Sequence, residues 1–344
     1  MNFANLAFDS ELTPGARNAV RTCLRIQPAE KVTVITDEVS QEIAAALVGE
    51  LEHVGCPYRV YRLEDYTKRP APDMPTEILA DMETSQVSIF AVVAQMNELS
   101  QRMQMTEVVN RRKMRHAHMV NIEKRIMLEG MRADFDRVDE LSVKIREIGQ
   151  RAKYIYARTP FGTDIAAQMN PHYHWIKTSG IISPFKWGNL PGGECFTTPG
   201  EVNGVFHIDG VVGDYLCAKY GDLRETPLII EIKHNRLVSA ESKNQELRDE
   251  FWEYTHRDEN SDRVGEFAIG TNLALRDVIG NILQDEKIPG VHIAFGNPYG
   301  AHTGADWYSS THIDVVGRQF DIWADDRKIM EDGKFAADLL ERAA

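Results

Sequence analysis

The first part of the chain alternates short apolar runs with segments of helical periodicity. Residues 31–37 form a β-branched run, which is typical of a strand. A helix is predicted next, with Ser40 as its candidate N-cap, a shared apolar face and Gly55 at its end. Residues 58–63 supply a second strand, and the nearly continuous apolar run 87–93 predicts a buried central strand. This alternation predicts an open parallel sheet within an α/β domain.

The pattern changes further along the chain. Residues 97–150 are helical and rich in methionine, and a strand is predicted at 153–157. Beyond Arg158, turn-rich stretches separate short strands, with hairpins predicted at His234-Asn235 and Asp332-Gly333. A chain of 344 residues exceeds the usual size of a single core. We therefore expect an α/β domain over 1–157 and a mixed α+β metal-binding domain over 158–344.

Ionisable residues enter the apolar segments of the second domain. Glu266, His292, His312 and Asp314 each lie among strand-forming residues, and Tyr299 follows the second of these segments. The period of two along a strand sends His312 and Asp314 to the same face, about 7 Å apart. Burying a carboxylate without a cation or hydrogen-bond donors costs several kcal/mol. A shared metal site explains all of these residues together.

Glu194, which follows two glycines, extends this set to five ligands. That is more than one open catalytic zinc requires, whereas two ions about 3.5 to 4 Å apart would use all five. Each residue also has a structural interpretation when it is taken singly. A strand histidine packs in a core, an aspartate accepts hydrogen bonds, Glu194 could face water and Tyr299 could be a packed turn aromatic. The pattern as a whole predicts a two-metal hydrolase.

Composition and charge narrow the class of protein. The formal charge of −13 argues against nucleic acid as a partner, and the basic run 111–116 is interpreted as a solvated helix face. No apolar run is long enough for a membrane helix, and residues 1–4 open no signal peptide. The four scattered cysteines predict neither disulfides nor thiolate metal sites, so we expect a cytoplasmic protein. A nicotinamide cofactor is not expected, since no G-x-G-x-x-G follows the first strand.

Several strings resemble the aminopeptidase T and aminopeptidase S family of metallopeptidases (M29). They are Asn189–Pro199, Gly265-Glu266, Asp285-Glu286-Lys287, His292–Gly296 with Tyr299, and Ser309–Asp314. The resemblance implies a broad-specificity aminopeptidase that is usually dimeric, acts on a peptide or small amide and uses zinc, cobalt, manganese or magnesium. It also implies an active-site position for Tyr299 and two metal ions bound by Glu194, Glu266, His292, His312 and Asp314.

The chain is also similar to the 2,5-dihydroxypyridine dioxygenases. In that family a histidine stands at the position of Glu266 and, with the pair matching His312 and Asp314, binds one Fe(II). Because this chain has Glu266 and keeps Glu194 and His292, the ligand set favours the hydrolase. In the hydrolase, Glu194 is expected to be a ligand or the general base, and Tyr299 to donate to the oxyanion. In a non-enzymatic binding protein the same acids would be structural.

Overall fold

The computed structural model describes residues 3–185 and 187–341, which form two compact units. The first unit contains the chain up to Asp136 together with Gly180–Gly192, and the second contains Arg137–Ser179 and the chain from Gly193 onward. These boundaries differ from the single domain boundary predicted after residue 157. The helix α6 (Phe135–Arg151) buries Leu141 and Ile145 in the core of the second unit. The short strand β8 (Gly188–Asn189) pairs with a strand of the first unit.

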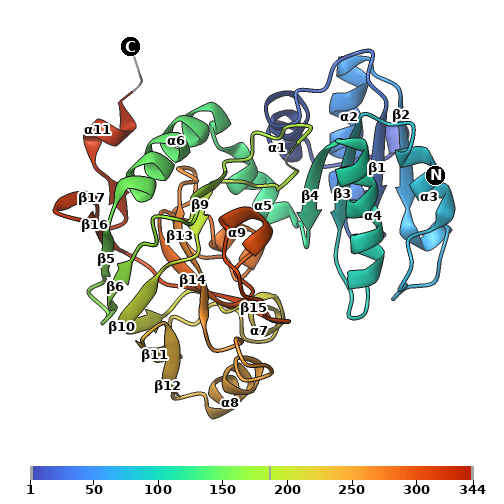
Figure 1. The fold of residues 1–344 in the computed structure, drawn as a ribbon. Helices are drawn as coiled ribbons and strands as arrows, with labels where there is room; N and C mark the ends of the chain where they lie inside the picture. The colour runs from blue at the N-terminus through green and yellow to red at the C-terminus, as the bar shows by residue number, and fades with distance from the viewer. Residues whose placement is uncertain (1–2, 186, 342–344) are drawn as a thin grey trace. The chain divides into compact units, whose positions relative to one another are not determined.

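The first unit is built on a five-stranded sheet of order β2-β1-β3-β4-β8, whose strands run parallel (Figure 1). This sheet confirms the predicted open α/β architecture. Its longer strands are β1 (Val32–Thr36), β2 (Tyr58–Arg62), β3 (Val87–Val92) and β4 (Arg115–Val120). Its helices are α1 (Thr13–Arg17), α2 (Gln41–Val54), α3 (Thr76–Met82), α4 (Leu99–Arg112) and α5 (Lys124–Leu128), with short helical turns at Phe3–Asn5, Ser10–Leu12, Asn18–Cys23, Leu63–Asp65 and Gly130–Arg132.

The helix α2 begins and ends where the sequence predicts. Ser40 occupies the N-cap position, but its side chain makes no capping hydrogen bond. Instead, its backbone N–H donates to Asp37 Oδ1 at 2.7 Å. Gly55 ends the helix with a φ of 76°, a left-handed conformation that glycine adopts without steric cost.

The second unit contains an eight-stranded sheet of order β12-β11-β10-β6-β5-β16-β17-β18 and a five-stranded sheet of order β15-β14-β13-β9-β7. Its strands are β5 (Tyr154–Arg158), β6 (Asp164–Gln168), β7 (Ile176–Thr178), β9 (Glu194–Thr197), β10 (Glu201–Ile208), β11 (Leu228–Lys233), β12 (Arg236–Ser242), β13 (Val264–Gly270), β14 (Gly290–Gly296), β15 (His312–Val316), β16 (Asp321–Ala324), β17 (Arg327–Glu331) and β18 (Lys334–Phe335). Besides α6, its helices are α7 (Asp214–Tyr220), α8 (Gln245–Tyr254), α9 (Ile282–Asp285), α10 (Gly300–Thr303) and α11 (Ala337–Leu340).

Both predicted hairpins are present in the larger sheet. β11 pairs with β12 across His234 and Asn235, and β17 pairs with β18 across Asp332 and Gly333. All four turn residues have positive φ, as two-residue hairpin turns require. Among the residues that the structure describes, no helix combines the length and the apolar character needed to cross a bilayer.

Candidate metal centre

The smaller sheet of the second unit has two chemically different faces. One face carries Cys195, Phe267, Ile269, Val291, Ile293, Phe295, Ile313 and Val315, all of which belong to the hydrophobic core. By the two-residue period of a strand, the alternate positions lie on the other face. That face receives Glu194 from β9, Glu266 from β13, His292 from β14, and His312 and Asp314 from β15. The structure thus brings all five predicted ligands to one sheet face.

Strand pairing places small residues between these polar side chains. Ala294 is paired with both Asp314 and Glu266, and Ala268 is paired with His292. In the same register, Gly296 stands opposite His312 and Gly270 opposite Glu194. Because alanine and glycine fill little space above the sheet, the longer ionisable side chains can converge over them.

Gly193 fixes the start of β9 and hence the position of Glu194. Its φ is 130°, and a Cβ there would lie 2.7 to 2.9 Å from atoms of Asn272. Its N–H donates to Thr178 O at 2.8 Å and its carbonyl accepts from Thr271 N at 2.7 Å. A residue with a side chain would force these contacts apart. The structure therefore requires glycine at position 193, the second glycine of the Gly-Gly-Glu string.

Glu194 is held by neighbours on both of its oxygens. Its Oε1 accepts from Lys287 Nζ at 2.9 Å and from Thr178 Oγ1 at 2.8 Å. Its Oε2 lies 3.4 Å from Nε2 of His292. Lys287 also forms an ion pair with Glu286. The 5% to 6% exposure of Glu194 and Glu266 and the complete burial of Lys287 show that this cluster is withdrawn from solvent.

His292 Nε2 is a buried nitrogen without a hydrogen-bond partner among the described residues. It lies 3.4 Å from Glu194 Oε2 and 3.5 Å from Glu266 Oε1, but neither contact has hydrogen-bond geometry. A buried polar atom without a partner is costly and calls for an explanation. An atom that is aimed between two carboxylates fits the lone pair of a metal ligand.

His312 is oriented by a backbone contact. Its Nδ1 lies 3.0 Å from Asn297 O, and because a carbonyl only accepts, Nδ1 carries the proton. In the neutral ring the Nε2 lone pair is then free, and Nε2 lies 3.5 Å from Asp314 Oδ2. Metal-binding histidines are commonly fixed in this way by a carbonyl on their other nitrogen.

Tyr299 lies beside this histidine. The two rings are 4.6 Å apart between centroids, and the tyrosine backbone has a φ of 49°. Asn297 holds both residues, since its side-chain Oδ1 accepts from Tyr299 N at 2.9 Å while its carbonyl binds His312. With 42% exposure, Tyr299 is not a packed core aromatic.

The comparisons with known proteins concern both the family and the fold. The sequence pattern of the family described as thermophilic metalloprotease (M29) matches residues 137–335, which is more than half of the chain. The chain belongs to this family. Membership confirms the first resemblance drawn from the sequence and gives the protein the general character of a metal-dependent peptidase. No curated protein sequence matches the chain closely enough to serve as a relative.

Two solved structures are similar over nearly the whole chain. Wild-type AmpT from Thermus thermophilus has a TM-score of 0.70 at 15% identity, covering 96% of this chain and 100% of its own. The 2,5-dihydroxypyridine dioxygenase from Pseudomonas putida KT2440 has a TM-score of 0.69 at 13% identity, covering 96% and 98%. At such identities the likeness shows a shared fold, and the same fold can carry different chemistries.

The charges of the site fit the divalent metal that this family uses. Ligand atoms of Glu194, Glu266 and His292 all lie within 4.8 Å of one another, and so do those of Glu286, His292 and Asp314. Such atoms need only small shifts to contact one ion at about 2.0 to 2.2 Å. Four buried or half-buried carboxylates face one lysine and two histidines here, so divalent cations would compensate the excess of negative charge.

Glu286 and Lys287 were not predicted as part of the site. The charged string Asp285-Glu286-Lys287 resembles an exposed turn, and only its place in the family motif could have indicated a role. In the fold, Asp285 accepts hydrogen bonds from three backbone N–H groups at residues 279–281. The bond from Asn272 N to Lys287 O, at 3.0 Å, then fixes the backbone beside Glu194.

The pKa shifts at the site follow from burial and from opposite charge. Burial raises the pKa of Glu286 to about 8 and also raises that of Glu266. Burial acts against the imidazolium form of His292, but Glu194 and Glu266 overcome it and raise the pKa to about 10. Asp314 likewise overcomes burial and raises the pKa of His312 to about 9. Protons and metal ions therefore compete for the same atoms.

This competition predicts how pH acts on the metal-free protein. Both histidines have folded-state pKa values above the ordinary value of about 6.5, so their stabilisation is fully present below that pH. It is lost as pH rises through about 9 and about 10. The raised pKa values of Glu266 and Glu286 act in the same direction. Urea unfolding in a chelator should show falling stability from about pH 6 to about pH 10. Constant stability over this range would contradict the raised pKa values of these histidines and glutamates.

Proposed function

We propose that this chain is an aminopeptidase that uses two divalent metal ions to activate water for hydrolysis of the N-terminal peptide bond or a related amide. The observation that carries the proposal is the convergence of Glu194, Glu266, His292, His312 and Asp314 on one sheet face, with His292 Nε2 unpartnered between two carboxylates. Family membership supports the peptidase part, while the aminopeptidase specificity and the number of ions are our proposal.

Four of the five predicted ligands, together with Glu286, form two groups that share His292. Glu194 and Glu266 form the first group with it, and Glu286 and Asp314 form the second. His312 adds its free Nε2 beside Asp314. We propose that these residues hold zinc, cobalt, manganese or magnesium, with Glu286 as a ligand in addition to the five. The ions would polarise the scissile carbonyl and lower the pKa of water from about 15.7 towards neutrality.

The chain's own groups would hold the ions and stabilise the developing oxyanion. Of the two roles expected for Glu194, ligand or base, we propose the ligand, which is supported by Lys287 and Thr178 at its Oε1 and His292 at its Oε2. We propose that Tyr299, half-exposed beside His312, donates a hydrogen bond from its hydroxyl to the developing oxyanion.

The metal content tests the proposal. Elemental analysis of protein purified without added metal is expected to find about two divalent ions per chain, as a two-metal site requires. About one iron per chain, with oxygen-dependent ring cleavage, would instead support the dioxygenase alternative that the ligand set disfavours. Absence of bound metal together with absence of peptidase activity would support the non-enzymatic interpretation of the acids.

We further propose a homodimer and a cytoplasmic location, both of which come from the sequence analysis. Light scattering of the purified protein would measure the mass of the assembly. A mass close to the 39.0 kDa of one chain would contradict the dimer.

A further inference from the structure

The first unit contains a cavity that shares no residue with the candidate metal centre. Its volume is about 570 Å³, within the range of small-molecule sites. Three loops line it, each following a different parallel strand. They contribute Asp37, Glu38 and Val39 after β1, Glu64, Thr67, Lys68 and Arg69 after β2, and Val93 and Gln95 after β3.

This cavity lies where the chain reverses its direction across the sheet. From β1 the chain moves outward to β2, and it then crosses back to β3 on the other side of β1. Helices α3 and α4 share a core cluster with Ile35 and Phe90, whereas α2 contributes no residue to that cluster. Ligands of open α/β sheets bind outside the carboxyl ends of the strands at such a switch point.

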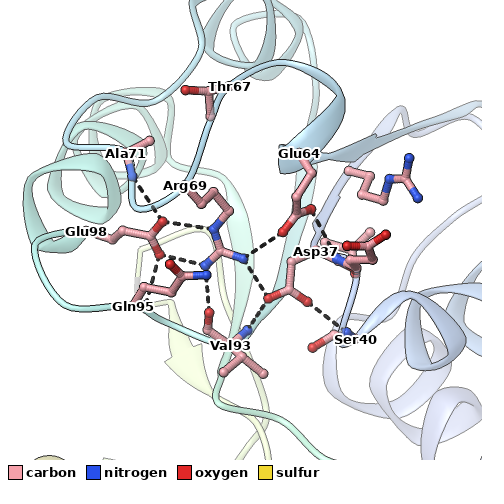
Figure 2. A network of polar contacts seen from close by, with 12 residues as sticks. Asp37, Ser40, Glu64, Thr67, Arg69, Ala71, Val93, Gln95 and Glu98 are labelled. Atoms are coloured by element: carbon pink, nitrogen blue, oxygen red, sulfur yellow. Dashed lines mark hydrogen bonds and ion pairs between the residues drawn. The ribbon is translucent and has the colours of Figure 1, made fainter.

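Arg69, one of the residues that line the cavity, is the centre of a network of polar contacts (Figure 2). Its Nε and Nη2 donate to the two oxygens of Glu98 at 2.8 and 2.6 Å, and Nη2 also donates to Val93 O at 2.6 Å. Its Nη1 donates to Asp37 Oδ2 at 2.9 Å and to Glu64 Oε1 at 3.1 Å. Five bonds use all five N–H groups, so Arg69 is not available to bind an anionic ligand.

The acids that surround this arginine outnumber it. Asp37 and Glu98 are buried and accept further bonds from the backbone N–H groups of Ser40, Val93, Gln95 and Ala71. Glu64 keeps a side-chain exposure of 28%, and its Oε1 and Oε2 each accept one bond, from Arg69 and from Glu38 N at 3.1 Å, so each oxygen keeps a second lone pair for a ligand. Among the residues that line the cavity, Glu38 adds a third carboxylate to Asp37 and Glu64, and Lys68 adds a second basic group to Arg69. The cavity therefore carries an excess of negative charge in a partly desolvated place.

The wall of the cavity also has an apolar part. Val39 is 76% exposed and lines the cavity together with Val93. An exposed valine next to accessible carboxylates would contact the methylene groups of a ligand whose positive end meets the acids. Thr67 and Gln95 add neutral hydrogen-bonding groups.

We propose that this cavity binds a small aliphatic amine, with its ammonium group at Glu38 and Glu64 and its hydrocarbon part against Val39 and Val93. A diamine and a free amino acid both contain an ammonium group and a hydrocarbon part. The proposal does not depend on the peptidase activity, since it concerns residues that are separate from the metal centre.

Calorimetric titration of the full-length protein with putrescine tests the proposal, with 1,4-butanediol as the uncharged analogue. Putrescine should bind saturably and butanediol should not. Glu64→Gln should weaken putrescine binding at least about tenfold, because hydrogen bonds to a charged group are among the stronger ones. Glu77→Gln, an exposed acid on α3 outside the cavity, is the matched control and should bind as the wild type does.

Two further variants keep the result independent of folding defects and of the metal centre. Lys68→Met removes a like charge from the rim and should tighten putrescine binding. Glu266→Gln should leave it unchanged, whereas an amine bound at the metal centre would lose affinity in that variant. Titration with L-leucine in the same way distinguishes a site for amines in general from a site for diamines. Binding of leucine as well as putrescine assigns the site to amines in general, and binding of putrescine alone assigns it to diamines.

Several results would overturn the proposal. They are no binding of either amine, equal affinity in Glu64→Gln and the wild type, or loss of binding in Glu266→Gln alone. Binding of inorganic phosphate that is weakened by Lys68→Met would show an anion site instead. Binding of Mg²⁺ alone, without amine binding, would show an inorganic cation site.

Discussion

Replacing Glu266 with glutamine is expected to lower hydrolysis of an aminoacyl anilide by about 10³-fold or more, since metal-assisted charge stabilisation contributes several kcal/mol. Glutamine keeps the size of the side chain but loses the charge that faces His292 Nε2 at 3.5 Å. The fold should remain intact because burial already raises the pKa of Glu266, so its ionised form is not a source of stability. Steady-state rates and urea unfolding of the same preparation measure both effects.

The matched control is Glu231→Gln, a strand glutamate in β11 of the same unit that forms an ion pair with Lys233 at the surface. It should keep wild-type rates. If Glu266→Gln also kept them with its metal content unchanged, Glu266 would be removed from the site and the two-metal proposal would lose its central ligand.

Replacing Lys287 with methionine is expected to destabilise the metal-free protein by about 3 to 5 kcal/mol, the cost of leaving buried charges uncompensated. The Lys287 side chain is only 1% exposed, and its ammonium group pairs with Glu194 and Glu286. Without it two buried carboxylates face each other. The deficit in unfolding free energy should shrink at low pH, where the remaining acids are protonated, and on addition of divalent metal, which supplies the missing positive charge.

Lys219→Met is the control for this variant. Lys219 also pairs with two glutamates, Glu246 and Glu250, but at the surface, with a side-chain exposure of 34%. Its loss should change stability by about 1 kcal/mol or less. Equal effects of the two substitutions would show that Lys287 does not compensate the acids of the metal centre.

Local patterns in the sequence were sufficient for several elements. The period of two in Thr311–Val315 placed His312 and Asp314 on one face, and their side chains lie 3.5 Å apart in the structure. The strand–helix unit from β1 to Gly55 and the hairpin turn at His234-Asn235 were also predicted correctly. Each depends on the conformational preference of a few neighbouring residues, which the sequence expresses directly.

Other features required strands that are distant in the sequence to pair in one register. Glu194 meets the other ligands because Gly270 is paired with it across β9 and β13, and an irregularity between Val264 and Glu266 sets the register of β13 against β14. A shift by one residue would send these side chains to the core face. The five residue types could be selected from the sequence, but their convergence could not be derived from local spacing.

The sequence by itself determined the strand–helix alternation of the first 93 residues, the parallel sheet, the hairpins and the types of residue available for metal binding, because these follow from local periodicity and turn chemistry. It missed the strand β4 (Arg115–Val120), which lies within the stretch 97–150 that was predicted to be helical, because the pairing of this strand with β3 is a tertiary contact. Only the tertiary structure decided that α6 joins the core of the second unit, that Lys287 is buried between Glu194 and Glu286, and that Arg69 collects acids from three loops. A lysine or an arginine is stable in such places only when carboxylates from distant segments compensate its charge. That compensation exists only after the chain has folded.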